Sequence, residues 1–110
     1  MNQSISFEEA REFLLRVDDW VIERQKELTA IPAPPFGEAP RAKRMAELFH
    51  EVGLTSIRED EEGNVLAEFP GHPAGTNPLI VSAHLDTVFP AGTDVTPRVS
   101  ADVIDRKSVV

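Results

Sequence analysis

A histidine and an aspartate stand two residues apart, directly after a short apolar stretch, and this spacing could support metal chemistry. The stretch spans residues 79–83, and the pair is His84 and Asp86, with Leu85 between them. In an extended chain, residues i and i+2 point to the same side, so the imidazole and the carboxylate project together while Leu85 turns back toward the core. One ring nitrogen of His84 could bind a metal ion. Asp86 could accept a hydrogen bond from the other nitrogen and so fix the tautomer and the ring orientation.

The triplet alone is also consistent with a histidine at a strand end that pairs with the neighbouring acid and binds no metal. A catalytic zinc ion needs about three protein ligands and an open position for water, and one histidine cannot supply them. Of the other histidines, His50 falls in the last turn of a predicted helix and His72 falls in a loop rich in glycine and proline. We interpret both as surface residues. The triplet alone therefore does not decide between the two interpretations, and the surrounding elements have to be considered.

Two helices and a stiff loop precede the pair. A helix is predicted over residues 7–28, because Ser6 and Glu9 form a capping box and apolar residues recur at helical spacing. These apolar residues are Phe7, Phe13, Leu14, Val17, Val21 and Leu28. A second helix should start near Pro40, a residue tolerated in a first turn, and should end with a left-handed cap at Gly53. Its inner face should consist of Ala42, Met45, Phe49 and Val52.

Several strands are predicted after the second helix. Residues 55–58 and 64–69 should form a hairpin around the acidic turn 59–63, whose carboxylates lack the alternating spacing of a calcium loop. Residues 79–83 are apolar throughout and predict a strand covered on both faces. Active sites of α/β sheets gather beyond such strand ends, which is where His84 and Asp86 fall.

The motifs occur in an order that points to one family. A proline-rich loop ending in Gly-Glu, a helix ending in Gly-Leu, a Gly-Asn strand start and an Ala-His-x-Asp-x-Val segment follow one another along the chain. They are residues Ile31 to Glu38, Gly53 to Leu54, Gly63 to Val65, and Ser82 to Val88. Over residues 7–104 the chain resembles the N-terminal part of zinc-dependent exopeptidases and amidohydrolases of the peptidase T, carboxypeptidase and aminoacylase type. The specificity lies in the ordered set, since each motif alone is weak.

This resemblance implies a fold and an activity. The fold would be α/β, the N-terminal part of a di-zinc exopeptidase-like catalytic domain with a helix, a second helix and then mixed sheet strands, in truncated form. The parent protein would be a zinc-dependent metallopeptidase or amidohydrolase that acts on a small peptide or an acylated amino acid. It would use two zinc ions, or another divalent metal, and would form a homodimer through a smaller inserted domain. The resemblance makes His84 a metal ligand and Asp86 the catalytic residue that orients it.

The resemblance also places the remaining metal ligands and the general base downstream of this chain. It makes residues 98–104 the strand pair that leads into a Gly-rich turn and a metal-bridging aspartate. Asp105 comes too early to be that aspartate, and Arg106 and Lys107 follow it where small residues would be expected. We therefore expect residues 1–104 to be an incomplete catalytic domain that is inactive alone. Residues 105–110 match a translated sequencing adapter and are interpreted as a non-native tail, with a natural basic terminus as the alternative. The competing hypothesis for the whole chain is a complete, non-catalytic α/β binding or interaction domain.

Composition narrows the range of partners. The 110 residues include 11 basic and 19 acidic side chains, for a formal net charge of −8. This charge repels nucleic-acid phosphate and anionic membrane surfaces, so neither is an expected partner. The chain has no cysteine, which excludes a disulfide framework and a thiolate metal site. The first residues lack the features of a secretory signal peptide, and a cytoplasmic location is therefore expected.

Overall fold

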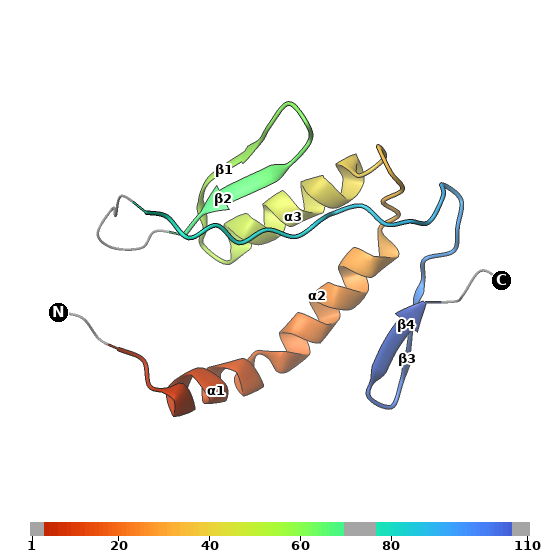
Figure 1. Ribbon diagram of the computed structural model, residues 1–110. Helices are drawn as coiled ribbons and strands as arrows, with labels where there is room; N and C mark the ends of the chain where they lie inside the picture. Colours follow the sequence, from red (N-terminus) through yellow and green to blue (C-terminus); the bar gives the residue numbers. More distant parts are fainter. Residues whose placement is uncertain (1–3, 70–76, 107–110) are drawn as a thin grey trace.

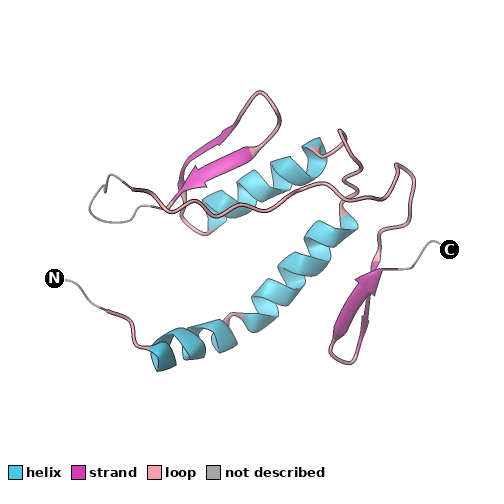
Figure 2. Ribbon diagram, in the orientation of Figure 1, coloured by secondary structure: helices cyan, strands magenta, loops and turns pink. Residues whose placement is uncertain are grey.

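The computed structural model describes residues 4–69 and 77–106, which form three helices and two antiparallel hairpins (Figures 1 and 2). The helices are α1 (Phe7–Arg16), α2 (Asp18–Ala30) and α3 (Ala39–Glu51). The strands are β1 (Thr55–Glu59), β2 (Val65–Glu68), β3 (Pro97–Ser100) and β4 (Val103–Arg106). The expected α/β class is confirmed. His72 lies outside the described residues.

The first predicted helix is present but bends at Val17. Ser6 caps α1, since its side-chain oxygen accepts a hydrogen bond from the Glu9 N–H at 3.1 Å, as the capping box predicts. Val17 has φ −96° and ψ 4°, outside the helical region, and separates α1 from α2. Asp18 and Asp19 then stand in the first turn of α2, where the helix dipole favours negative charge.

The apolar side chains of α1 are exposed. No residue of α1 is buried, and Phe7 is 82% exposed. The physical reason is that α2 is the only element among the described residues that α1 contacts substantially. Helical periodicity identified the apolar side of α1, but no neighbouring surface covers that side.

Helix α3 and the first hairpin form the best-packed part of the chain. Pro40 lies in the first turn of α3, and Gly53 adopts φ +86° just after its end, both as predicted. Ala42 and Leu48 are buried, Met45 and Phe49 are half-buried, and Val52 is exposed, so the predicted inner face is only partly right. Strands β1 and β2 pair in antiparallel fashion and pack against α3.

The acidic turn between β1 and β2 is organised by one carboxylate, as expected for a solvated hairpin turn. Asp60 accepts hydrogen bonds at 2.9 Å from the N–H groups of Glu62 and Asn64 and from the Asn64 side chain. These bonds, the Asn64 side chain foremost, hold the pKa of Asp60 below its usual range. Gly63 takes φ +87°, which favours glycine.

The strand predicted over residues 79–83 is not formed, and this prediction was wrong. The segment has no strand pairing, and Leu79, Ile80 and Val81 are 89%, 82% and 87% exposed. An apolar sequence can form a buried strand only where a neighbouring strand supplies hydrogen-bond partners, and none of the described elements does so here. The two sheets are antiparallel hairpins, so the mixed sheet expected from the resemblance is also absent from the described residues.

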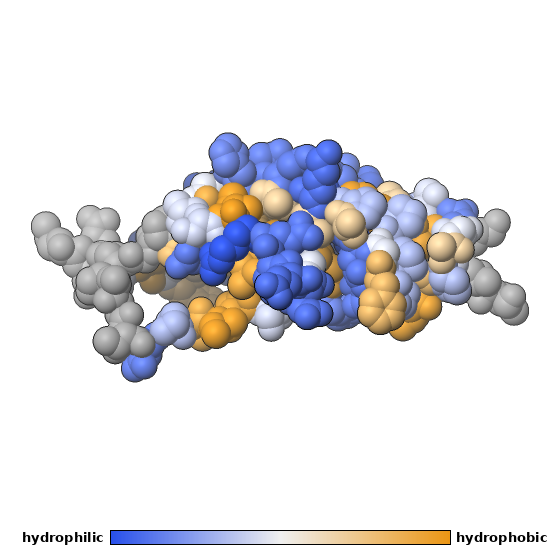
Figure 3. Space-filling model, turned by 90° about the horizontal axis from the view of Figure 1, so that it is seen from above, coloured by the Kyte–Doolittle hydropathy of each residue, from blue (hydrophilic) through white to orange (hydrophobic). Residues whose placement is uncertain are grey.

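The last described residues form the predicted strand pair, and the arrangement of the described elements is open. Strands β3 and β4 pair from Pro97 with Arg106 to Ser100 with Val103, and β3 contacts α2. The radius of gyration is 16.8 Å, compared with about 13 Å for a compact domain of about 100 residues. Among the described residues, the buried apolar side chains are Ala33, Ala42, Leu48 and Val95. Figure 3 accordingly shows apolar residues at the surface.

Candidate functional site

The side chains of His84 and Asp86 meet, as the i, i+2 spacing predicts. Nδ1 of His84 lies 2.8 Å from the backbone carbonyl oxygen of Asp86 and 3.2 Å from its carboxylate oxygen Oδ1. Leu85 between them is half-buried. The His84 side chain is 84% exposed and that of Asp86 is 45% exposed. The expected alternation is therefore present here, although the segment belongs to no sheet.

The partners of Nδ1 assign the tautomer of His84. A backbone carbonyl oxygen can only accept a hydrogen bond, so Nδ1 must carry the hydrogen. In the neutral imidazole, Nε2 is then the nitrogen with the free lone pair. Among the described residues, Nε2 has no hydrogen-bond partner. In this neutral tautomer, the nitrogen that could bind a metal ion faces solvent.

The segment that carries this pair is held against the proline-rich loop that precedes α3. The guanidinium group of Arg41, in the first turn of α3, donates a hydrogen bond at 2.8 Å to the carbonyl oxygen of Leu85. The same group donates to the carbonyl oxygen of Ile31 in the loop. One side chain therefore joins the residue between His84 and Asp86 to the end of α2.

A second contact lies just beyond the pair. The N–H of Thr87 donates at 2.8 Å to the carbonyl oxygen of Ala33, and the Thr87 hydroxyl donates to the same oxygen at 3.3 Å. Ala33 is only 1% exposed. Residues 77–89 thus cross α3 as an extended segment (Figure 1), anchored at Leu85 and Thr87. Two motifs that lie far apart in the sequence, the proline-rich loop and the Ala-His-x-Asp segment, are in direct contact.

An ion cluster fixes the two helices that frame the loop. Arg44 of α3 forms a hydrogen-bonded ion pair with Glu27 of α2 and also donates to Glu47 and Glu51. The hydrogen bond from Arg44 lowers the pKa of Glu27, and the same bond raises the pKa of Arg44 above its usual range. Arg44 thus links α3 to α2 through the ion pair with Glu27, while Arg41, three residues earlier on α3, donates to Leu85.

The described residues do not bring together a full set of metal ligands. Among residues 4–69 and 77–106, no three histidine or acidic side chains gather as a metal site would require. Asp105, to which we assigned no ligand role, accepts a hydrogen bond from Arg98 across β3 and β4 at 3.1 Å. His50 is exposed at the end of α3, as expected. A complete catalytic zinc site would therefore need ligands from beyond the described residues.

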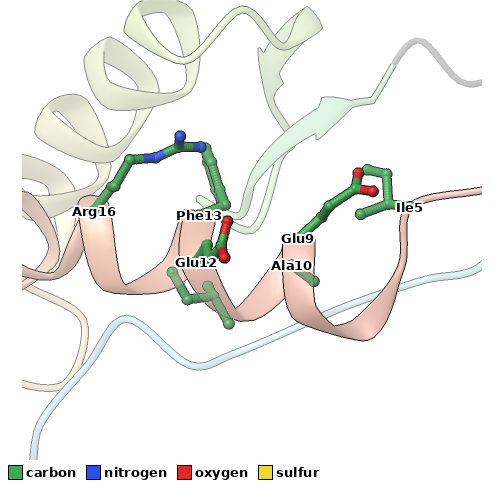
Figure 4. Close-up of a pocket in the computed structure, with 7 residues that line it drawn as sticks. Ile5, Glu9, Ala10, Glu12, Phe13 and Arg16 are labelled. Atoms are coloured by element: carbon green, nitrogen blue, oxygen red, sulfur yellow. The ribbon is translucent and has the colours of Figure 1, made fainter.

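A shallow hollow on α1 is unrelated to this pair. It is lined by Ile5 and by residues of α1, and Arg16 lies over the ring of Phe13 at its edge (Figure 4). All of its lining residues belong to one helix and the residue before its cap, so it is a surface depression. It contains neither His84 nor Asp86.

Two residues of the site were missed by reasoning from the sequence. Arg41 and Thr87 hold the segment in place through contacts that span 44 and 54 residues. Arg41 directly precedes the inner-face residue Ala42, and this was the available signal that its stem lies near the core. Its acceptor could not be read from that position.

Comparisons with known proteins add no family to this description. No protein-family model matches the chain, and no curated protein matches it. In the described part of the chain, no helix combines the length and the apolar character needed to cross a membrane.

Proposed function

We propose that this chain is the N-terminal part of a metal-dependent hydrolase of peptide or other amide bonds, in which His84 is the first metal ligand. One observation carries the proposal. Nδ1 of His84 faces the carbonyl and carboxylate oxygens of Asp86, at 2.8 and 3.2 Å, so that in the neutral imidazole Nε2 carries the free lone pair. A histidine that binds zinc usually donates its other N–H to such an acceptor.

The residues fit the proposed metal in part. His84 would hold one zinc ion through Nε2, and Asp86 would keep the imidazole in the required tautomer and orientation. A zinc ion in such a site would polarise the scissile carbonyl and lower the pKa of a bound water. The other ligands, the general base and the groups that select the substrate would lie beyond this chain. A small peptide or an acylated amino acid as substrate, a cytoplasmic location and a homodimeric parent belong to the same proposal.

The exposed apolar segment favours this proposal over a complete binding domain. Leu79, Ile80 and Val81 lead directly into His84 and are more than four-fifths exposed. A strand of this composition is normally covered on both faces. Additional chain packed on this segment would cover it and could bring further metal ligands to the end where His84 lies.

The test compares the 110-residue chain with a protein extended by the native codons that follow residue 104. We expect the extended protein to bind zinc and to hydrolyse dipeptides or N-acyl amino acids, while the 110-residue chain does neither efficiently, because it lacks the required number of ligands. In the extended protein, His84→Ala should lose metal and activity together. His50→Ala is the matched control and should keep both, because His50 is exposed at the far end of α3. Full activity in His84→Ala, or an extended protein without metal-dependent hydrolysis, would overturn the proposal.

A further inference from the structure

The guanidinium group of Arg41 contacts two segments that lie far apart in the sequence, the proline-rich loop and the segment that carries His84. It donates at 2.8 Å to the carbonyl oxygen of Leu85 and also to that of Ile31. Leu85 is the residue between His84 and Asp86. Its carbonyl group belongs to the peptide unit that also contains the Asp86 nitrogen, so fixing this oxygen restricts the rotation of that peptide plane.

The orientation of this peptide plane determines whether His84 can pair with Asp86. Nδ1 of His84 reaches the backbone carbonyl oxygen of Asp86 and its Oδ1 atom only while residues 84–86 keep their present backbone conformation. The bond from Thr87 to Ala33 also fixes the chain, but Thr87 follows Asp86 and so lies outside the triplet 84–86. Arg41 is the contact that acts inside the triplet.

We propose that Arg41 is a positioning residue, which sets the tautomer and orientation of the His84 imidazole by holding the Leu85 carbonyl group. That this positioning serves metal binding rests on the function proposed above, but the effect of Arg41 on the His84 imidazole does not. Arginine suits this role because its planar group offers several N–H donors in a fixed fork, so that one side chain can bridge two carbonyl oxygens. Glutamine, which is shorter and uncharged, cannot span both.

The experiment measures the tautomer of His84 in the 110-residue chain by long-range ¹H–¹⁵N spectra of the imidazole rings. The measurement is made near pH 8, above the ordinary imidazole pKa of about 6.5. In the wild-type chain we expect His84 mainly in the Nδ1–H form. In Arg41→Gln we expect a shift toward the Nε2–H form, which predominates in free histidine. His50 serves as an internal reference and should not change.

Arg44→Gln is the matched control. Arg44 lies on the same helix and binds Glu27, Glu47 and Glu51, but it does not contact residues 84–86. The Arg44→Gln substitution should therefore leave the tautomer of His84 unchanged, although it removes the ion pair between α2 and α3. Circular dichroism of both variants shows whether the helices are retained. A His84 tautomer that shifts equally in Arg44→Gln would overturn the role, because the effect would then be one of general destabilisation.

The failure of this inference can be distinguished from the failure of the proposed function. An unchanged Nδ1–H form in Arg41→Gln overturns the positioning role, whatever the extended protein does. A tautomer that shifts only in Arg41→Gln supports the role, even if the extended protein proves to have no hydrolase activity. If the extended protein does bind zinc, Arg41→Gln should weaken that binding about 10- to 100-fold, as is typical for partners that orient a ligand.

Discussion

The N–H of Thr87 donates a hydrogen bond to the carbonyl oxygen of Ala33 at 2.8 Å and so joins two loops that are 54 residues apart in the chain. Ala33 is 1% exposed and Thr87 is half-buried. The bond is therefore partly shielded from solvent, which makes it harder for water to replace than a fully exposed bond. The position of His84 and Asp86 depends on this contact and on Arg41.

Enlarging Ala33 should loosen the segment that carries His84. Ala33→Leu adds volume at a closed site, and overpacking of this kind costs about 1 to 3 kcal/mol. Amide hydrogen exchange at Thr87 should accelerate accordingly, by roughly 5- to 150-fold at about 1.4 kcal/mol per tenfold change. The control is Ala30→Leu at the exposed end of α2, which should leave the exchange rate of Thr87 unchanged. Unaltered protection of Thr87 in Ala33→Leu would show that the loop contact does not depend on this packing.

Replacing the Asp86 carboxylate should show whether Asp86 orients His84 or binds the metal directly. In the extended protein we expect Asp86→Asn to keep most of the bound metal and to lose activity by about 10- to 100-fold, because it acts on the orientation of His84. The backbone carbonyl contact at 2.8 Å survives this substitution. Metal content by mass spectrometry and steady-state kinetics check the expectation. Asp102→Asn, in the exposed turn between β3 and β4, is the control.

Loss of a whole metal equivalent in Asp86→Asn, with folding intact, would instead make Asp86 a direct ligand. The carboxylate is 45% exposed, so such a role is sterically open to it. The two outcomes differ in metal content rather than in activity alone, which is why both measurements are needed.

Local signals in the sequence predicted much of the fold, and long-range packing accounts for what they missed. The cap at Ser6, the left-handed Gly53 and the turn around Asp60 each depend on residues a few positions apart, and all three are found. The strand predicted over residues 79–83 was wrong, because strand pairing and burial depend on neighbouring segments that the local pattern does not describe.

In the candidate site, too, the local contacts could be predicted from the sequence and the long-range contacts could not. The approach of His84 to Asp86 follows from the two-residue repeat of an extended chain and could be predicted. The contacts of Arg41 and Thr87 could not, because they join segments whose relative positions are set only when the loop folds back on α3. The roles of His84 and Asp86 in metal binding stay predictions.

Acidification should weaken the contact between α2 and α3. The hydrogen bond from Arg44 lowers the pKa of Glu27 below its ordinary value of 4.5. The folded form therefore holds this proton less tightly than the unfolded form. The contribution of the pair is complete above pH 4.5 and is lost as the pH falls through the lowered pKa. Carboxyl ¹³C shifts should show a lower pKa for Glu27 in the wild-type chain than in Arg44→Gln.

The same titration can be followed through structure. Helical circular dichroism should decrease in the wild-type chain below about pH 4.5, the ordinary value for the carboxyl group. Glu27→Gln should start with weaker α2–α3 packing and show a smaller change over this range, because it has no carboxylate to protonate there. Asp60 titrates in both proteins and cancels in the comparison. Identical Glu27 pKa values in the wild-type chain and in Arg44→Gln would contradict the proposed coupling.

The exposed segment before His84 should drive self-association of the isolated chain. Leu79, Ile80 and Val81 present apolar side chains and backbone groups that pair with no described strand, and such segments invite pairing with other chains. We expect the 110-residue chain to bind hydrophobic dyes and to form oligomers as its concentration rises, while keeping its helical signal. Ile80→Lys should reduce both effects, since a charge at an exposed edge opposes pairing. Val52→Lys, at an exposed apolar position outside this segment, should change them much less. A monomeric, dye-free wild-type sample with a sharp cooperative melt would contradict the prediction and would favour a complete small domain.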